Sequence, residues 1–352
     1  MNVAVPRRDA EQGENPSMSN KKSRVAVIGT GGSISMPGRH SLDLYEYSDY
    51  GRVLEVDELL AMFPEVNEVA EPVPVRFRAL PSSSITATDW LELNDKITDL
   101  VRADPSLSGV VITHGTDTVE ETAYFLHLAA KVDVPIIMVA AQRPPNGLGT
   151  DSGINLVNAL RVASSPLARG MGVMLVMNDE IQCAREVTKM MNSRMHTFQS
   201  PDYGSLGQAD PVGNVAFYRK PIRRHMPDTE FDLSGLRELP RVDIVYGYAG
   251  VDGFIVEKLV EAGAKGIVIA GLPSGSLPPA QGEALVEASR RGVLVVKSRR
   301  SSAGRQYIHT KDIDTGIISG DNLSPQKARI LAMLALAKTS DRDEIRRMFL
   351  EY

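Results

Sequence analysis

Two polar loops, each directly after an apolar run, carry the residues of this chain that are best suited to chemistry. After the run at residues 109–112, the hydroxyl of Thr116 stands beside the carboxylate of Asp117. A second run, near the N-terminus, leads into a glycine-rich loop with the hydroxyls of Thr30 and Ser33. Loops at the carboxyl ends of parallel strands meet at one edge of a sheet, where α/β proteins bind ligands. Two hydroxyl-bearing loops at such an edge predict nucleophilic catalysis.

Lys189 is a candidate base for this site. It follows the apolar run at residues 172–177, which predicts another strand, so its side chain can reach the same edge of the sheet. A lysine held there by Asp117 can accept a proton from the hydroxyl of Thr116. The alternative is purely structural, because Thr and Asp are good helix N-caps and Glu120 stands three residues after Asp117, as in a capping box.

The glycine-rich loop departs twice from the dinucleotide-binding fingerprint that it superficially matches. Ile34 stands where the third glycine is needed, and Pro37 lies where the phosphate-binding helix has to form. No His, Cys, Asp and Glu residues in the sequence have the spacing of a metal site. His114 is expected to be a packed, hydrogen-bonded strand residue. These motifs therefore predict neither a nucleotide nor a metal ion.

Length and composition narrow the class of protein. The chain has 352 residues, 43% of them hydrophobic, enough for a full core and two domains. A net charge of -5 with both signs interspersed argues against nucleic acid and membrane surfaces as partners. The single cysteine, Cys183, excludes an intrachain disulfide. Residues 1–23 lack the apolar centre of a signal peptide, which predicts a disordered tail and a cytoplasmic location.

The elements that must position the polar loops follow an alternating pattern. Short Val- and Ile-rich runs alternate with helical periodicity, which predicts an α/β fold with a parallel sheet covered on both faces. Strands are expected at residues 24–28, 109–113, 134–140, 172–177, 242–246, 266–269 and 293–296, and helices at 89–101, 119–131 and from Ser324 onward. Ser324 is predicted to be an N-cap followed by Pro at the first helical position.

A stretch rich in Pro, Gly and charge, from Gly204 to Pro240, separates two groups of elements. We therefore expect a larger, mainly parallel-sheet N-terminal domain at residues 24–215. A linker at residues 216–240 is expected to precede a smaller C-terminal α/β domain at residues 241–352.

Several motifs in fixed order make the chain resemble the bacterial L-asparaginase family, from Arg24 to Tyr352. They are TGGSI at residues 30–34, ITHGTDTVEETAYF at 112–125, AQRP at 141–144, MND at 177–179, VTK at 187–189, YGSLG at 203–207 and LSPQKAR at 323–329. The resemblance implies a two-domain α/β amidohydrolase without metal or organic cofactor. It also implies a homotetramer of intimate dimers with shared active sites, and an acyl-enzyme mechanism.

The resemblance also implies roles for single residues. Its nucleophilic threonine corresponds to Ser33 here, and its Thr-Asp-Lys triad to Thr116, Asp117 and Lys189. Ser82 corresponds to the serine that holds the substrate α-carboxylate, while Asp117 would also hold the α-ammonium group.

The main chain of the two glycine-rich loops, Gly115 included, would contact the substrate and stabilise the oxyanion. A mobile lid at residues 35–51 would supply a tyrosine that orients the nucleophile. Tyr47 is the first candidate for this tyrosine and Tyr50 the second.

The chain departs from the family at two further places. Gly250 stands where the family commonly has an asparagine donated by the neighbouring subunit, and the stretch at residues 298–310 lacks a recognisable acidic residue. We therefore expect hydrolysis of L-asparagine to L-aspartate and ammonia, with either Ser33 or Thr116 attacking first. Three alternatives stay open: a relaxed amidase on glutamine, D-asparagine or another small amide, a non-catalytic amino-acid sensor, and an amidotransferase subunit.

Overall fold

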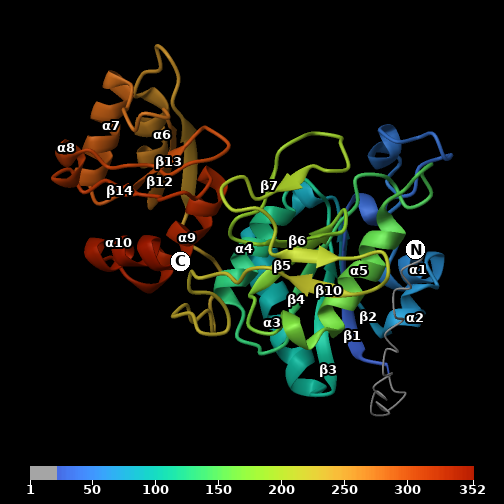
Figure 1. Cartoon of the computed structure of the whole chain (residues 1–352). Helices are drawn as coiled ribbons and strands as arrows, with labels where there is room; N and C mark the ends of the chain where they lie inside the picture. The colour runs from blue at the N-terminus through green and yellow to red at the C-terminus, as the bar shows by residue number, and fades with distance from the viewer. Residues whose placement is uncertain (1–21) are drawn as a thin grey trace, which may run out of the picture.

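The computed structural model describes residues 22–352, apart from the side chains of Tyr50, Lys311 and Ile313. Residues 1–21, which make up nearly all of the predicted tail, lie outside this range. A large N-terminal body and a smaller C-terminal body lie side by side (Figure 1). The prediction of an α/β fold with two unequal domains is confirmed.

An eight-stranded sheet forms the centre of the N-terminal domain. Its strands are β1 (Arg24–Gly31), β2 (Glu71–Leu80), β3 (Leu107–Thr113), β4 (Ile136–Val139), β5 (Val173–Met177), β6 (Glu180–Cys183), β9 (Gly207–Ala209) and β10 (Val215–Phe217). Their order in space is β10-β9-β6-β5-β4-β3-β1-β2, with β2, β1, β3, β4 and β5 mutually parallel. A separate antiparallel pair, β7 (Thr188–Lys189) and β8 (Phe198–Gln199), carries Lys189.

The parallel strands are apolar on both faces because helices cover both. Alternate residues of a strand point to opposite faces: in β1, Ala26 and Ile28 enter one hydrophobic cluster, and Val25 and Val27 enter another. The first face is covered by α3 (Ala87–Ala103) and α4 (Val119–Ala129), the second by α1 (Val56–Met62), α2 (Val66–Val69) and α5 (Ser152–Ser164). Three short 3-10 helices, η1 (Ser33–Ser35), η2 (Glu46–Tyr50) and η3 (Ser82–Ser84), lie near the predicted site, and η4 (Pro166–Ala168) follows α5.

The long strand β2 was not among the predicted strands. It is one of the two edge strands of the sheet, and among the strands of residues 22–352 it pairs only with β1. Pro72 and Pro74 lie within it, and proline argues against a strand in sequence because it cannot donate a ladder hydrogen bond. An edge strand tolerates proline where the missing N–H would face away from the sheet.

The boundary predicted at residue 215 falls inside β10, so the large sheet continues into the predicted linker. Three-residue strands such as β9 and β10 are too short to produce a periodic signal. The rest of that connection is also packed, since Met226, Phe231 and Leu233 are buried in the main hydrophobic cluster.

The C-terminal domain is a four-stranded parallel sheet with helices on both faces. The strands β11 (Val242–Tyr246), β12 (Gly266–Gly271), β13 (Leu294–Arg299) and β14 (Ile318–Ser319) lie in chain order. The helices α6 (Phe254–Glu261) and α7 (Pro279–Arg290) pack on one face, and α9 (Pro325–Lys338) and α10 (Arg342–Glu351) belong to the other, while the short α8 (Thr310–Ile313) precedes β14.

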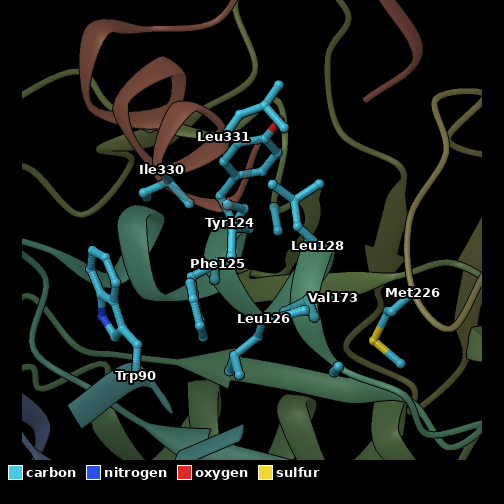
Figure 2. Close-up of a cluster of buried hydrophobic side chains, with 14 of the residues drawn as sticks. Trp90, Tyr124, Phe125, Leu126, Leu128, Val173, Met226, Ile330 and Leu331 are labelled. Carbon is cyan, nitrogen blue, oxygen red and sulfur yellow. The ribbon is translucent and has the colours of Figure 1, made fainter. Parts of the chain in front are cut away.

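Helix α9 joins the two domains. It begins as predicted, with Ser324 at the N-cap position and Pro325 in the first turn, although the Ser324 side chain makes no capping hydrogen bond. Ile330 and Leu331 of α9 lie over Tyr124 and Leu128 of α4 (Figure 2). The core of the C-terminal sheet and the core of the large sheet are therefore continuous through α9.

Candidate active site

The candidate site lies where the strand order of the large sheet reverses. From β1 the chain moves outward to β2 and then returns to the other side of β1 as β3. Loops leaving neighbouring strands on two sides of such a switch point open a crevice at the carboxyl edge. The loops after β1 and β3 carry Ser33 and Thr116, so topology alone brings the two predicted hydroxyls to one place.

Two glycines allow these loops to touch. Gly32 has a φ of 82°, and a Cβ on it would lie 2.0 Å from the main-chain nitrogen of Gly115. A Cβ on Gly115 would in turn lie 2.5 Å from the hydroxyl oxygen of Ser82. Any side chain at either position would push the loops apart. These glycines therefore bring Ser33, Ser82 and Thr116 to the same cleft.

Lys189, Thr116 and Asp117 form one hydrogen-bonded group. The Lys189 Nζ donates to Thr116 Oγ1 at 2.8 Å and to Asp117 Oδ1 at 2.9 Å. The Lys189 side chain is 19% exposed, whereas the Asp117 side chain is 71% exposed and faces solvent at the cleft. The lysine is thus held largely out of water with its nitrogen against a buried hydroxyl, an arrangement suited to proton transfer.

The capping-box interpretation of this loop is wrong. The N-cap of α4 is Thr118, and no side chain makes a capping hydrogen bond there. The Glu120 carboxylate instead accepts the main-chain N–H of Lys189 at 3.0 Å. Because the chain reaches Lys189 from a distant strand pair, no local sequence pattern could show this contact.

The hydroxyls of Ser33 and Thr30 make different contacts, although both belong to the first loop. Thr30 Oγ1 donates to the carbonyl of Thr113 at 2.7 Å, so this side chain joins β1 to β3 and does not reach the cleft. Ser33, on η1, lines the cleft and donates its hydroxyl proton to the carbonyl of Ala141 at 2.6 Å. Only Ser33 of the two can meet a substrate.

Ser82 also lies in the cleft. It opens η3 directly after β2, and only 4% of its surface is exposed. The Thr118 hydroxyl donates to the Ser82 carbonyl at 2.8 Å, which joins this turn to the start of α4. The position of Ser82 is therefore fixed from two sides.

The predicted lid at residues 35–51 covers part of the cleft with η2. Tyr47 is half-buried and lines the cleft, whereas Tyr45 lines it but is almost fully exposed. Burial raises the pKa of the Tyr47 phenol, and its interaction with the Ser33 hydroxyl opposes that rise. The side chain of the second candidate, Tyr50, lies outside the described residues.

The cleft has a volume of about 330 Å³, enough for a small amino acid, and sequence reasoning missed part of its lining. Gln142, Asn192 and Ser193 also line it. Gln142 follows β4 at the carboxyl edge, and that position was a signal that could have identified it. Asn192 and Ser193 lie in the loop between β7 and β8, for which the sequence offers no such signal.

Other predicted features lie away from the cleft. His114 is fully buried, with ring nitrogens 2.8 Å from the Gly115 carbonyl and 2.9 Å from the Thr122 hydroxyl, and burial lowers its pKa to about 4. Gly250 lies in the turn after β11 with a φ of 79°. Arg299 and Arg300, in the stretch 298–310, bond main-chain carbonyls of Asn322 and Gly247.

Among residues 22–352, no group of three or more His, Cys, Asp or Glu side chains is arranged to hold a metal ion. Of the helices in that same part of the chain, none is long and apolar enough to cross a bilayer.

Comparison with known proteins places this geometry in one family. The family described as "Asparaginase, N-terminal" matches residues 24–223, and the family described as "Glutaminase/Asparaginase C-terminal domain" matches residues 241–349. The "Glutaminase-asparaginase" of Pseudomonas fluorescens biotype A is 39% identical, over 97% of this chain and 94% of that protein. The "L-asparaginase 2" of Escherichia coli (strain K12) is 38% identical over 93% of both chains.

A solved structure agrees with these matches. The crystal structure of a "Probable Cytoplasmic L-asparaginase from Campylobacter jejuni" is 39% identical in sequence and superposes with a TM-score of 0.89. The match covers 94% of this chain and all of that one. Both domains, in the same order and over nearly their whole length, are thus shared with these proteins, and the chain belongs to the asparaginase family of amidohydrolases.

Proposed function

We propose that this protein hydrolyses L-asparagine to L-aspartate and ammonia. The observation that carries the proposal is the bonding of Lys189 to Thr116 and Asp117 beside Ser33 in one cleft. The relatives named L-asparaginase support the choice of substrate. An amino-acid sensor would not need a lysine held against a hydroxyl, so the geometry favours turnover.

In the proposed mechanism, Ser33 Oγ bonds to the carbon of the side-chain amide. The negative charge on the amide oxygen is stabilised by main-chain N–H groups of the two loops, those of Ser33 and Thr116. Gly32 is excluded from this role because its N–H donates to the Leu80 carbonyl at 3.0 Å.

The carbon–nitrogen bond then breaks, and the nitrogen leaves as ammonia with the proton released by the hydroxyl. Thr116, Lys189 and Asp117 pass this proton, and they take one from the water that later hydrolyses the acyl-enzyme. L-Aspartate is released and the Ser33 hydroxyl is restored. Tyr47 is proposed to orient Ser33, since it is half-buried and lines the same cleft.

We propose that Ser82 and Asp117 bind the amino-acid part of the substrate. Ser82 is a buried donor for the α-carboxylate, and the exposed carboxylate of Asp117 suits the α-ammonium group. Gly115 would contact the substrate through its main chain, because a Cβ there would displace Ser82.

The function is tested by ammonia release from L-Asn, D-Asn, L-Gln and simple amides. We expect release from L-Asn, and a loss of about 10²–10⁴-fold in Ser33→Ala, Thr116→Val and Lys189→Met. Thr98→Val is a matched control, since its hydroxyl only bonds the Asn94 carbonyl within α3.

Each outcome of this panel has a distinct meaning. Binding of amino acids without release of ammonia would overturn the proposed activity in favour of a sensor. Hydrolysis of another amide, with none of L-Asn, would keep the mechanism and replace the proposed substrate. Mass spectrometry of the acyl-enzyme identifies which hydroxyl attacks first, because the acyl adduct will lie on a peptide with Ser33 or on one with Thr116.

We propose that the protein assembles as a homotetramer of dimers with shared active sites. The C-terminal domain exposes an apolar face on β11, the following turn and α6. Its members, each more than 40% exposed, are Ile244, Tyr246, Tyr248, Phe254 and Ile255. Such a patch is typical of a protein–protein interface. Native mass spectrometry is expected to give four times 38.3 kDa, and a 38.3 kDa species alone would contradict the assembly.

We also propose a cytoplasmic location. The structural relative from Campylobacter jejuni is called cytoplasmic, although the 35% identical relative from Haemophilus influenzae is called periplasmic. Fractionation of the source cells, with ammonia release as the assay, distinguishes a cytoplasmic from a periplasmic location.

A further inference from the structure

A buried carboxylate connects Lys189 to the C-terminal domain. Glu120 lies in the first turn of α4, one turn after Asp117, and is 6% exposed. Its Oε2 accepts the Lys189 N–H at 3.0 Å, and its Oε1 accepts the side-chain amide of Gln326 in the first turn of α9. One side chain therefore holds the lysine main chain, the helix that follows Asp117 and a helix of the other domain.

The next residue of α9 holds the segment just before Lys189. Lys327 is 2% exposed, and its Nζ donates to the carbonyls of Ala184 at 2.8 Å, Arg185 at 3.2 Å and Val187. An ammonium group has three protons and no acceptor, so three carbonyls satisfy it fully. The chain from β6 to Lys189 is thus attached to α9 as well as to the large sheet, where the Ala184 N–H donates to the Val173 carbonyl at 3.1 Å.

Helix α9, which carries Gln326 and Lys327, packs closely on α4. The apolar side of α9 packs on α4 through Ile330 and Leu331 against Tyr124 and Leu128 (Figure 2). The Lys327 Nζ also lies 5.9 Å from the centre of the Tyr124 ring. Gln326 and Lys327 therefore have fixed positions relative to α4, and through it to Thr116 and Asp117.

We propose that Glu120 is a positioning residue for the catalytic lysine and that Gln326 acts through it, so that helix α9 of the C-terminal domain sets the geometry of proton transfer. The inference rests on the proposed function, in which Lys189 Nζ must stay at hydrogen-bond distance from Thr116 Oγ1. Small displacements of such groups reduce the rate steeply while substrate binding, which relies on other groups, changes little.

Four variants test this proposal by ammonia release from L-Asn. We expect Glu120→Ala to lower kcat about 10- to 100-fold with KM changed less than about threefold, and Gln326→Ala to lower kcat less. Glu120→Gln should keep kcat within about threefold, since its amide oxygen still accepts the Lys189 N–H and the Gln326 amide can turn to accept its N–H₂. The double variant E120A/Q326A should be no worse than E120A, because Gln326 acts only through Glu120.

Glu230→Ala is the matched control. The Glu230 side chain is 15% exposed, accepts Arg347 Nη2 at 2.9 Å and lies outside the cleft. We expect this variant to unfold at lower temperature with an unchanged kcat. If E120A also loses only thermal stability, the proposal is wrong. It is wrong as well if the fold-losses of kcat in E120A and Q326A multiply in the double variant. If E120Q loses as much kcat as E120A, the positioning role of Glu120 is also wrong, and its negative charge is what supports the reaction.

Hydrogen exchange at the Lys189 amide separates this proposal from the proposed function. The bond to Glu120 should protect this amide in the wild type and in E120Q, and E120A should lose the protection, whether or not the protein releases ammonia. Protection that is unchanged in E120A would overturn the positioning role even in an active enzyme. An inactive wild type with the expected exchange pattern would instead contradict only the amide hydrolysis.

Discussion

At the scale of single residues, the substitution of serine for threonine at Ser33 has a physical consequence. Serine has three accessible χ1 rotamers, whereas a β-branched threonine is restricted. In the structure the Ser33 hydroxyl donates to the Ala141 carbonyl, so at least one of its rotamers directs it toward the main chain. In the proposed mechanism, time spent in this rotamer lowers the fraction of encounters in which the hydroxyl can attack.

We therefore expect Ser33→Thr to raise kcat for L-Asn about two- to fivefold while KM stays within about twofold. Stopped-flow or coupled assays of ammonia release measure both constants. If the threonine variant loses activity as Ser33→Ala does, the added methyl group does not fit at this position. Limited space, rather than rotamer freedom, would then explain the serine.

The sequence indicated the polar residues of the site better than their contacts. Ser33, Thr116 and Asp117 follow strands that were predicted, so their position at one edge could be predicted too. Ser82 follows the missed strand β2, and only the family resemblance indicated it. Lys189 reaches the cleft from the small β7–β8 pair, and its support by Glu120 depends on contacts between residues 69 positions apart. Such contacts have no local signal, so the sequence offered for Glu120 only the alternative of a capping box.

At the scale of secondary-structure elements, helix α9 has a titratable group in its first turn. Burial lowers the pKa of Lys327 to about 8 from its usual value of 10.5, while Arg185 lowers it further and Glu120, Cys183 and Glu186 oppose the shift. Between pH 8 and 10.5 the unfolded chain therefore binds more protons at this residue than the folded chain. The contribution of Lys327 to the free energy of unfolding rises with pH across this window.

We expect the difference in unfolding free energy between wild type and Lys327→Met to grow by up to roughly 3 kcal/mol from pH 8 to 10.5 in favour of the wild type. Urea unfolding of both proteins at a series of pH values measures this difference. A difference that stays constant, or falls, would show that Lys327 keeps an ordinary pKa in the folded protein.

Elements with a strong apolar period were predicted well, and edge elements were not. The buried strands β1, β3, β4 and β5 and the helices α3 and α4 lie close to their expected positions. The edge strand β2 and the short β9 and β10 were missed, because prolines or extreme shortness remove the pattern on which such predictions depend.

At the scale of the whole molecule, Gly250 is the position at which we propose that assembly and substrate binding are connected. It lies in the turn between the exposed Tyr248 and Phe254, and a Cβ on it would have no described atom of its own protomer within 4 Å. Its φ of 79° is in the left-handed region, which asparagine tolerates better than other residues with a Cβ. An asparagine can therefore be placed there without strain inside the protomer.

If neighbouring subunits share their active sites, Gly250→Asn should lower KM for L-Asn by about tenfold or more, since a hydrogen bond to a charged group contributes about 1.5–3 kcal/mol. Steady-state kinetics measures this change, and Gly250→Ala is the control that alters the backbone without adding an amide. An unchanged KM in a protein whose native mass is four times that of the chain would mean that this turn does not reach the partner's cleft.

The proline-containing edge strand β2 bears on how the protein behaves in concentrated solution. An open sheet edge normally invites strand addition by another chain, because it presents a row of unsatisfied N–H and carbonyl groups. Pro72 and Pro74 remove two of these donors, and Arg76 and Arg78 place ion-paired charged side chains along the same strand, with Asp57 and Asp89 as partners. Self-association through this edge is thereby discouraged, whereas the exposed apolar face of the C-terminal domain is the surface through which we propose that copies of the chain meet.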